Sequence, residues 1–259
     1  MRKKIFYNRT GFITLFKREI DRFMKMYIQT LLAPLLSNLL FLGIFGGMLR
    51  TRSVGIEGVD YLSFLTPGLA AMGAIFASFQ NPSFSIISQK YQDTLKDLNS
   101  YPLSDTEKVL AFVLSGTFRG VLIGTLTYIA AIFFIDHVIT HPLVFIIMLT
   151  VISFIFSSIG VIVGLAVNSY ERINFILSIV LTPLAYFGGV FFEADKLSGT
   201  FSNLVYINPL YPMINLVRFG FLGVSGGYLL LQFIIVFVIS FGAFGTAFLC
   251  FKKGLGLKS

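Results

Sequence analysis

Charge is scarce in this sequence. Charged residues make up 12% of its 259 positions, whereas hydrophobic residues make up 56% and the mean hydropathy is +0.84. Average soluble domains carry about 25% charged residues, because polar groups must cover their surface. The composition therefore excludes an ordinary soluble domain and predicts an integral membrane protein.

Cysteine and catalytic motifs are also scarce. The single cysteine, Cys250, excludes an internal disulfide and a multi-cysteine metal site, and we interpret it as a small apolar residue. His137 and His141 lie four positions apart beside Asp136, but Pro142 follows at once, so we interpret this segment as a solvated turn and expect no metal. The sequence has no Walker pattern and no nucleophile elbow, so we expect neither a phosphate-binding loop nor hydrolytic catalysis.

Acidic residues are absent from the interior of every long apolar stretch. This absence argues against a proton- or sodium-driven carrier, whose coupling usually uses an intramembrane carboxylate. Arg119 is the interior charge, and two interpretations stay open for it. It contacts an anionic substrate headgroup, or it snorkels to the inner interface or bonds neighbouring carbonyls.

The uncharged stretches themselves predict six transmembrane helices, because a helix needs about 20 apolar residues to cross the hydrocarbon core. We place these spans near residues 26–49, 61–84, 109–135, 142–167, 173–192 and 228–251. The expected fold is all-α, a polytopic membrane protein with a single transmembrane domain over residues 1–259. Prolines inside the spans predict kinks at Pro34, Pro67, Pro82 and Pro183.

Lys and Arg residues are distributed unevenly between the two sides that alternating spans define. Fifteen of the 20 fall on the side of the N-terminus, four fall on the other side, and Arg119 lies inside a span. Cationic loops are retained in the cytoplasm during insertion, so we expect both termini to be cytoplasmic. We expect the net charge of +8 to favour membrane lipids with anionic headgroups, and no nucleic acid.

Residues 10–25 have the pattern of an amphipathic interfacial helix on the cytoplasmic leaflet. Its polar residues include Arg18, Glu19 and Arg22. Its apolar residues recur at intervals of three or four positions: Phe12, Phe16, Ile20, Phe23 and Tyr27. The alternative is a basic anchor that only sets the orientation of the chain.

Residues 85–104 form the largest internal cytoplasmic segment, and a second apolar stripe runs along it. Its members, Ile87, Tyr91, Leu95 and Leu98, are spaced as on one face of a short helix. This stripe contacts a partner, or it packs on the membrane or on the protein's own helices. The capping box that begins at Ser104 and ends at Glu107 predicts the start of the third span.

Residues 193–227 are too polar to span the membrane and too apolar for a solvated loop. We expect outer re-entrant helices there, between spans five and six. Glycine pairs at Gly188–Gly189 and Gly226–Gly227 flank this segment and give the backbone freedom to turn.

In combination these segments resemble the membrane subunit of type-2 ATP-binding cassette (ABC) exporters, of the bacterial drug, lipo-oligosaccharide and polysaccharide group. The resemblance covers nearly the whole chain and depends on four elements. They are Phe16-Lys-Arg-Glu-Ile-Asp-Arg-Phe with the later Leu-Leu-Ala-Pro, Phe64-Leu-Thr-Pro-Gly-Leu, Tyr101-Pro-Leu-Ser, and Phe187-Gly-Gly-Val-Phe-Phe running to Asn208-Pro-Leu-Tyr-Pro. The family often continues its Phe-Phe element with proline, whereas this chain has Glu193.

The resemblance implies a permease that forms the path for a lipid, lipid-linked glycan or hydrophobic drug-like substrate in the bacterial inner membrane. The implied partners are a second permease copy, as a homodimer, and two cytoplasmic ATPase subunits. ATP and magnesium would bind those subunits, and this chain would bind no cofactor. The competing functions are an ATP-independent secondary carrier or channel and a membrane-bound lipid-modifying enzyme.

The resemblance also implies roles for particular residues. The helix at 10–25, with Phe16, Arg18, Glu19 and Arg22, would be the connecting helix of the family. The ATPase-coupling residues would be Ile87, Tyr91, Asp93, Leu95, Lys96 and Leu98. The substrate path would include Arg119, Pro67, Phe187 and Phe191.

Overall fold

The computed structural model describes residues 8–49, 59–135, 139–192, 200–224 and 226–256. Every regular element in these ranges is a helix. Six of the described helices are long and apolar enough to cross a membrane, which confirms the predicted all-helical fold with six candidate spans. Residues Asp136 and His137 lie outside the described ranges.

The spans begin and end within a few residues of the predicted positions, with one exception. They are η1 (Ile28–Leu32) with α2 (Ala33–Leu49), α3 (Tyr61–Tyr91), α4 (Asp105–Ala131), α5 (Pro142–Ala166), the fifth span Tyr170–Val190, and α10 (Leu229–Lys252). The fifth span consists of α6 (Tyr170–Phe175), η3 (Ile176–Leu181), α7 (Thr182–Ala185) and η4 (Tyr186–Val190). The exception is α3, which continues seven residues beyond its predicted end.

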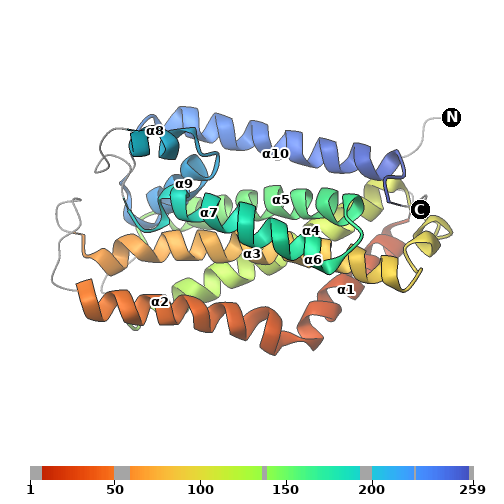
Figure 1. Cartoon of the computed structure of the whole chain (residues 1–259), viewed down its shortest axis with the longest axis horizontal. Helices are drawn as coiled ribbons and strands as arrows, with labels where there is room; N and C mark the ends of the chain where they lie inside the picture. Colours follow the sequence, from red (N-terminus) through yellow and green to blue (C-terminus); the bar gives the residue numbers. More distant parts are fainter. Residues whose placement is uncertain (1–7, 50–58, 136–138, 193–199, 225, 257–259) are drawn as a thin grey trace.

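The central helix of the bundle is α3, and nearly all of its side chains are buried against α4, α5 and α9 (Figure 1). Small residues allow this close packing. A Cβ added at Gly116 would lie 2.2 Å from Ser157 Oγ, and one at Gly160 would lie 2.4 Å from the carbonyl oxygen of Phe79. Membrane helices commonly use such residues because backbones can then approach closely. By contrast, α2 and α10 are peripheral.

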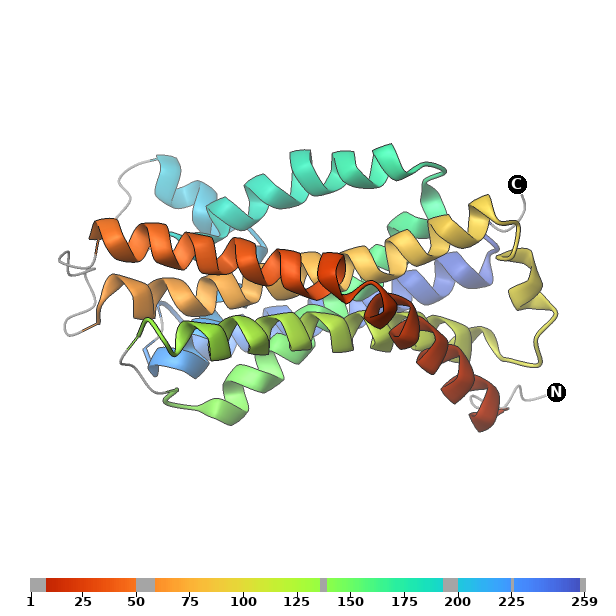
Figure 2. The same cartoon turned by 90° about the horizontal axis from the view of Figure 1, so that it is seen from below.

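The two ends of the bundle differ in what they carry. The start of α1 (Arg9–Lys25), the connection between α3 and α4, and the end of α10 lie together at one end (Figures 1 and 2). We call this the terminal end. The short helices α8 (Thr200–Ile207) and α9 (Leu210–Leu222) lie toward the opposite end.

Two of the four prolines predicted to make kinks follow a π-helical turn. Pro34 comes two residues after η1, and Pro183 comes two residues after η3. Single π turns inside α-helices are rare and often mark functional sites. A further break lies at Gly189, whose φ of 84° is accessible to glycine at little cost.

The segment 87–98 is not the separate amphipathic helix that the spacing predicts. Ile87 and Tyr91 belong to the last turns of α3, the chain then turns at Asp93 with φ 55°, and a short 3-10 helix, η2 (Lys96–Asn99), follows. Asp tolerates this left-handed conformation better than most residues. The side chains of Ile87, Leu95 and Leu98 are fully buried in the protein's own core, whereas Tyr91 is exposed. Three of the four residues of the stripe therefore pack on the protein's own helices, and Tyr91 is the member that stays exposed.

The N-terminal helix is present, as predicted, and its predicted apolar residues Phe12, Phe16 and Phe23 are buried or half-buried. Its fully buried residues are Leu15, Glu19 and Phe23, which are spaced four apart. The helix packs on α4, and Glu19 also contacts Ser85 in the last turns of α3. Tyr27, predicted to lie on the apolar face, is 52% exposed. A buried carboxylate on this face was not expected from the sequence.

Within the segment 200–222, α9 is almost entirely buried. It packs against α3, α5 and α10 and ends at Gly223, which has φ 74°. At about 1.5 Å per residue its 13 residues span roughly 20 Å, too short to cross a bilayer.

Candidate functional site

A buried polar network at the terminal end joins α1 to α3 around the carboxylate of Glu19. Glu19 is 1% exposed. Its Oε2 accepts a hydrogen bond from Ser85 Oγ at 2.6 Å and from Arg22 Nε at 3.2 Å, while Oε1 accepts from Arg18 Nη2 at 2.9 Å. Buried charges are tolerated only when they are paired and hydrogen-bonded, and this carboxylate meets both conditions.

The same network continues along α3 into α4. Arg22 Nη2 donates to the carbonyl oxygen of Asn81 at 2.8 Å and to its Oδ1 at 3.0 Å, and Asn81 Nδ2 donates to Ser115 Oγ at 3.2 Å. Gln89 Nε2 donates to Ser85 Oγ at 3.0 Å and Gln89 accepts from Arg18 Nη2 at 3.3 Å. The α3 partners of this network were not predicted from the sequence. Their signal is a polar stripe at intervals of four residues in an otherwise apolar helix: Asn81, Ser85 and Gln89.

The predicted capping box at the start of α4 is confirmed and has a second role. Glu107 Oε2 accepts hydrogen bonds from the backbone N–H of Ser104 at 2.7 Å and from its Oγ at 2.8 Å. Its Oε1 accepts from the backbone N–H of Asn8 at 2.8 Å. Asn8 is the N-cap of α1, where its Oδ1 accepts from Gly11 N at 3.0 Å. Glu107 thus holds together the first residues of α1 and α4.

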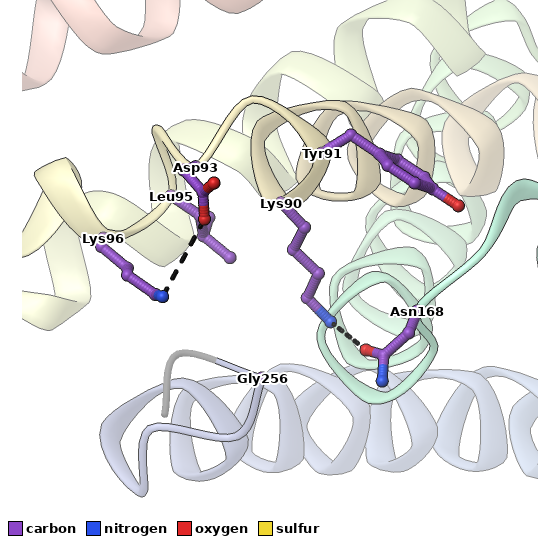
Figure 3. Close-up of a pocket in the computed structure, with 7 residues that line it drawn as sticks. All are labelled: Lys90, Tyr91, Asp93, Leu95, Lys96, Asn168 and Gly256. Atoms are coloured by element: carbon purple, nitrogen blue, oxygen red, sulfur yellow. Dashed lines mark hydrogen bonds and ion pairs between the residues drawn. The ribbon is translucent and has the colours of Figure 1, made fainter. Parts of the chain in front are cut away.

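Three of the six residues predicted to couple to an ATPase are exposed at a pocket of about 220 Å³. Tyr91, Asp93 and Lys96 lie along one side of this pocket, and Lys96 Nζ is 3.9 Å from Asp93 Oδ1 (Figure 3). The buried pair Leu95 and Leu98 anchors the turn that presents them. The terminal end therefore carries an exposed surface with an aromatic ring and both charge signs.

The other side of the pocket comes from the connection between α5 and α6 and from the turn after α10. Lys90 Nζ donates to the carbonyl oxygens of Leu165 at 2.7 Å and Val167 at 2.8 Å, and to Asn168 Oδ1 at 3.3 Å (Figure 3). A lysine placed at the last carbonyls of a helix is favourable, because those groups lack partners and carry negative partial charge. Gly256 packs on the same lysine, with a φ of 69°.

Of the remaining residues predicted in the 10–25 helix, Arg18 and Arg22 belong to the Glu19 network. Phe16 is half-buried in the core of the terminal end and stacks on Phe12, with ring centroids 6.2 Å apart. The structure thus brings all four predicted residues of this helix, Phe16, Arg18, Glu19 and Arg22, onto the side that faces the bundle or its edge.

Arg119 lies where α1 and α2 join. It is 5% exposed, and its Nη2 donates to the carbonyl oxygen of Thr30 in η1 at 3.2 Å. Among the described residues, no hydrogen-bond partner reaches its buried Nε. Thr30 Oγ1 in turn donates to the carbonyl oxygen of Phe23 at 2.7 Å. This geometry matches the interpretation in which the guanidinium bonds neighbouring carbonyls.

An aromatic cluster lies near the opposite end, between the first, second and fifth spans. Phe191 has ring centroids 5.9 Å from both Phe41 and Phe45 and 5.3 Å from Tyr186, and Phe45 lies 6.2 Å from Tyr61. The cluster is a large apolar surface in the half of the molecule away from the charges of the terminal end.

The other two residues predicted in the substrate path differ in exposure. Phe187 is 45% exposed on the fifth span, whereas Pro67 is buried inside α3. The turn after Pro67 touches the fifth span, since a Cβ added at Gly68 would lie 2.8 Å from the carbonyl oxygen of Val190.

Arg218 is a residue whose position the sequence did not predict. It lies in the segment 193–227, where it is buried in α9, donates to the carbonyl oxygen of Gly189 at 2.6 Å, and lies 4.0 Å from the centroid of the Phe64 ring. A guanidinium is suited to bind a carbonyl and an aromatic face together. Arg218 thereby ties α9 to the break in the fifth span.

Among the described residues, no group of three His, Cys, Asp or Glu side chains is placed to hold a metal ion. In these ranges the buried carboxylates are those of Glu19 and Glu107. Their carboxylates are occupied by protein donors, so they are suited to positioning and not to proton transfer.

Comparison with known proteins agrees with this architecture. The family model described as ABC-2 type transporter matches residues 10–222. The inner membrane transport permease YadH of Escherichia coli K12 is 30% identical over 249 residues, which cover 95% of this chain and 96% of YadH. Nodulation protein J of Rhizobium meliloti is 25% identical over 220 residues, covering 82% of this chain and 81% of that protein.

Both findings concern nearly the whole length of the transmembrane bundle. The family model spans the first five candidate membrane helices and α9, and YadH matches almost from end to end. The chain therefore belongs to the ABC-2 type transporter family, as a multi-pass inner membrane permease, the non-catalytic subunit that works with ATPase partner subunits.

Proposed function

We propose that two copies of this permease and two ATPase subunits form an exporter for a lipid, a lipid-linked glycan or a hydrophobic drug-like compound. ATP and magnesium bind the ATPase subunits. The terminal end faces the cytoplasm, and α9 is a re-entrant helix of the outer side. The observation that carries the proposal is the anchored, exposed surface of Tyr91, Asp93 and Lys96 at the terminal end.

The distribution of charge supports this orientation. The basic residues of α1, the α3–α4 connection and the end of α10 lie at the terminal end, and cationic segments stay in the cytoplasm during insertion. An ATPase in the cytoplasm then meets the turn from Tyr91 to Lys96. We assign the docking contacts to these exposed residues, while Ile87, Leu95 and Leu98 hold the turn in place.

The aromatic cluster supports an apolar substrate. Phe191 and its neighbours contribute to the outer half of the path, and Phe187 is exposed beside them on the fifth span. Rings of this kind bind acyl chains or flat drug-like molecules through apolar area and need few polar contacts. Pro67 acts indirectly, through the packing of α3 on the fifth span, and Arg119 acts by holding η1.

The first and fifth spans are the surfaces we assign to the second copy. Both are peripheral, and both expose large apolar side chains, among them Leu36, Leu40 and Ile179. Pairing these faces would enclose a path between the two copies, next to the aromatic cluster.

The proposal is tested by co-purifying the tagged permease with the ATPase encoded beside it and measuring ATP hydrolysis in lipid nanodiscs, with and without the permease. Native mass spectrometry gives the stoichiometry. A two-plus-two complex whose hydrolysis differs from that of the free ATPase supports the proposal. Failure of every candidate ATPase to bind would refute it.

A further inference from the structure

The segment 85–104, which we call the coupling segment, is fastened to α1 at both of its ends. Ser85, its first residue, donates to Glu19 Oε2 at 2.6 Å. Ser104, its last residue, donates to Glu107 Oε2, while Glu107 Oε1 accepts from the N–H of Asn8. The two fastening points lie at different places along α1, which runs from Arg9 to Lys25: one is its N-cap, Asn8, and the other is Glu19 in its second half.

Both fastenings depend on a carboxylate that the protein buries. Glu19 is 1% exposed and Glu107 is fully buried. Each accepts one hydrogen bond from a residue distant in sequence, Ser85 Oγ for Glu19 and the backbone N–H of Asn8 for Glu107, and further bonds from residues close to it in sequence. Loss of either carboxylate would leave these donors without their partner. Charge-assisted hydrogen bonds stabilise a contact and also fix the relative orientation of the groups that they join. Apolar packing alone would define the orientation of the helices less strictly.

The far end of α1 leads directly into the first span. Helix α1 ends at Lys25, and η1 begins at Ile28 and continues into α2. Thr30 Oγ1 donates to the carbonyl oxygens of Phe23 and Met26, and Arg119 donates to the carbonyl oxygen of Thr30. The joint between α1 and α2 is therefore braced, and a displacement of α1 is carried into the first span.

We propose that Glu19 and Glu107 are positioning residues that clamp α1 to both ends of the coupling segment, so that the two move as one rigid unit and drive the first span. The proposal rests on the proposed function, since the force comes from an ATPase docked at Tyr91, Asp93 and Lys96. The clamp itself is a property of the permease and is testable without the partner.

The first experiment uses the full-length permease in nanodiscs, with Cys250→Ser to remove its native thiol. Spin labels on Lys17→Cys in α1 and Asp97→Cys in the coupling segment, both exposed positions, report the distance across the clamp. We expect one narrow distance distribution when both glutamates are present. In the double variant Glu19→Gln with Glu107→Gln we expect this narrow distribution to be lost. Ser85→Ala removes one of the same bonds without changing the charge, and it is the second variant if the pair does not fold.

Asp21→Asn is the matched control, because Asp21 is an exposed carboxylate on the same helix. An unchanged distribution in both the Glu variants and Ser85→Ala would overturn the clamp. This outcome is separate from the failure of an ATPase to bind, which would refute the proposed function and leave the measurement on the permease intact.

The second experiment adds the ATPase and compares nucleotide-free and ATP-bound complexes. In the parent protein the Lys17–Asp97 distance is expected to stay the same in both states, since a rigid unit moves without internal change. In Glu19→Gln the distance is expected to change with ATP, and the permease-dependent hydrolysis is expected to fall about fivefold or more. A distance that changes with ATP in the parent protein, or a variant that hydrolyses like Asp21→Asn, would overturn the proposal.

Discussion

The carboxylate of Glu107 accepts a hydrogen bond from the backbone N–H of Asn8, 99 positions earlier in the chain, at 2.8 Å. This bond closes the terminal end of the bundle, because the first turn of α1 is thereby fixed to the first turn of α4. The coupling segment lies between that bond and the Glu19–Ser85 bond. Buried hydrogen bonds thus hold in place the surface that would meet an ATPase.

Leu95→Asp is expected to destabilise the permease itself. Leu95 is buried in the core of the terminal end, so a carboxylate there would lack a partner and its packing would be lost. We expect a loss of at least about 3 kcal/mol in the free energy of unfolding. Thermal stability measured by the elution of a fluorescently tagged protein would show it, since the chain has no tryptophan.

Lys96→Glu is the contrasting change on the same turn. Lys96 is exposed and its ion pair with Asp93 is long, at 3.9 Å, so folding should be unaffected because exposed pairs contribute about 0–1 kcal/mol. Binding to the ATPase should weaken. If Lys96→Glu binds the ATPase normally, the docking surface must lie elsewhere on the permease.

Gly160→Ala should weaken the contact between α3 and α5. The new Cβ would lie 2.4 Å from the carbonyl oxygen of Phe79, which belongs to backbone and cannot move aside cheaply. We expect a loss of about 1–3 kcal/mol in unfolding free energy. Gly242→Ala is the matched control, because a Cβ there meets nothing within 4 Å, and equal stabilities of the two variants would contradict the packing.

Much of this fold could be predicted from the sequence, because apolar length and charge placement decide it. The six candidate spans and the Ser104–Glu107 capping box follow from local patterns. The stripe of Ile87, Leu95 and Leu98 was correctly identified as apolar, but periodicity does not say whether such a face is buried within the chain or against another protein. Here it is buried within the chain.

The polar network could not be predicted for a related reason. Glu19 was placed on the polar side of an amphipathic helix, where carboxylates normally face water. Its burial depends on Ser85 and on two arginines that lie one and three positions from it. The sequence pattern of α1 alone does not predict these contacts, because they form only when α1 packs beside α3.

Gly189→Ala should strain the break in the fifth span. At φ 84° an alanine costs about 1–2 kcal/mol more than glycine, and the carbonyl oxygen of Gly189 is the acceptor for Arg218. We expect lower thermal stability and slower permease-dependent hydrolysis. Wild-type behaviour in both measurements would show that the break is not required.

Arg119→Met tests whether this guanidinium has a role at the joint of α1 and α2. The change removes the donor to the Thr30 carbonyl while keeping a long side chain in place. We expect permease-dependent hydrolysis to fall several-fold, on the scale of about 1–3 kcal/mol of coupling, and Arg119→Lys to retain most of it. If complexes with Arg119→Met and with the parent protein hydrolyse ATP at equal rates, Arg119 has no part in coupling.

The most direct measurement is site-specific cross-linking to the ATPase in the membrane. In a Cys250→Ser background, Lys96→Cys at the terminal end is compared with Asn203→Cys, an exposed position on α8 toward the opposite end. A photoreactive thiol reagent should link the ATPase to the cysteine at position 96 and not to that at position 203. Cross-linking at position 203, or at neither position in a complex that still co-purifies, would contradict docking through the coupling segment.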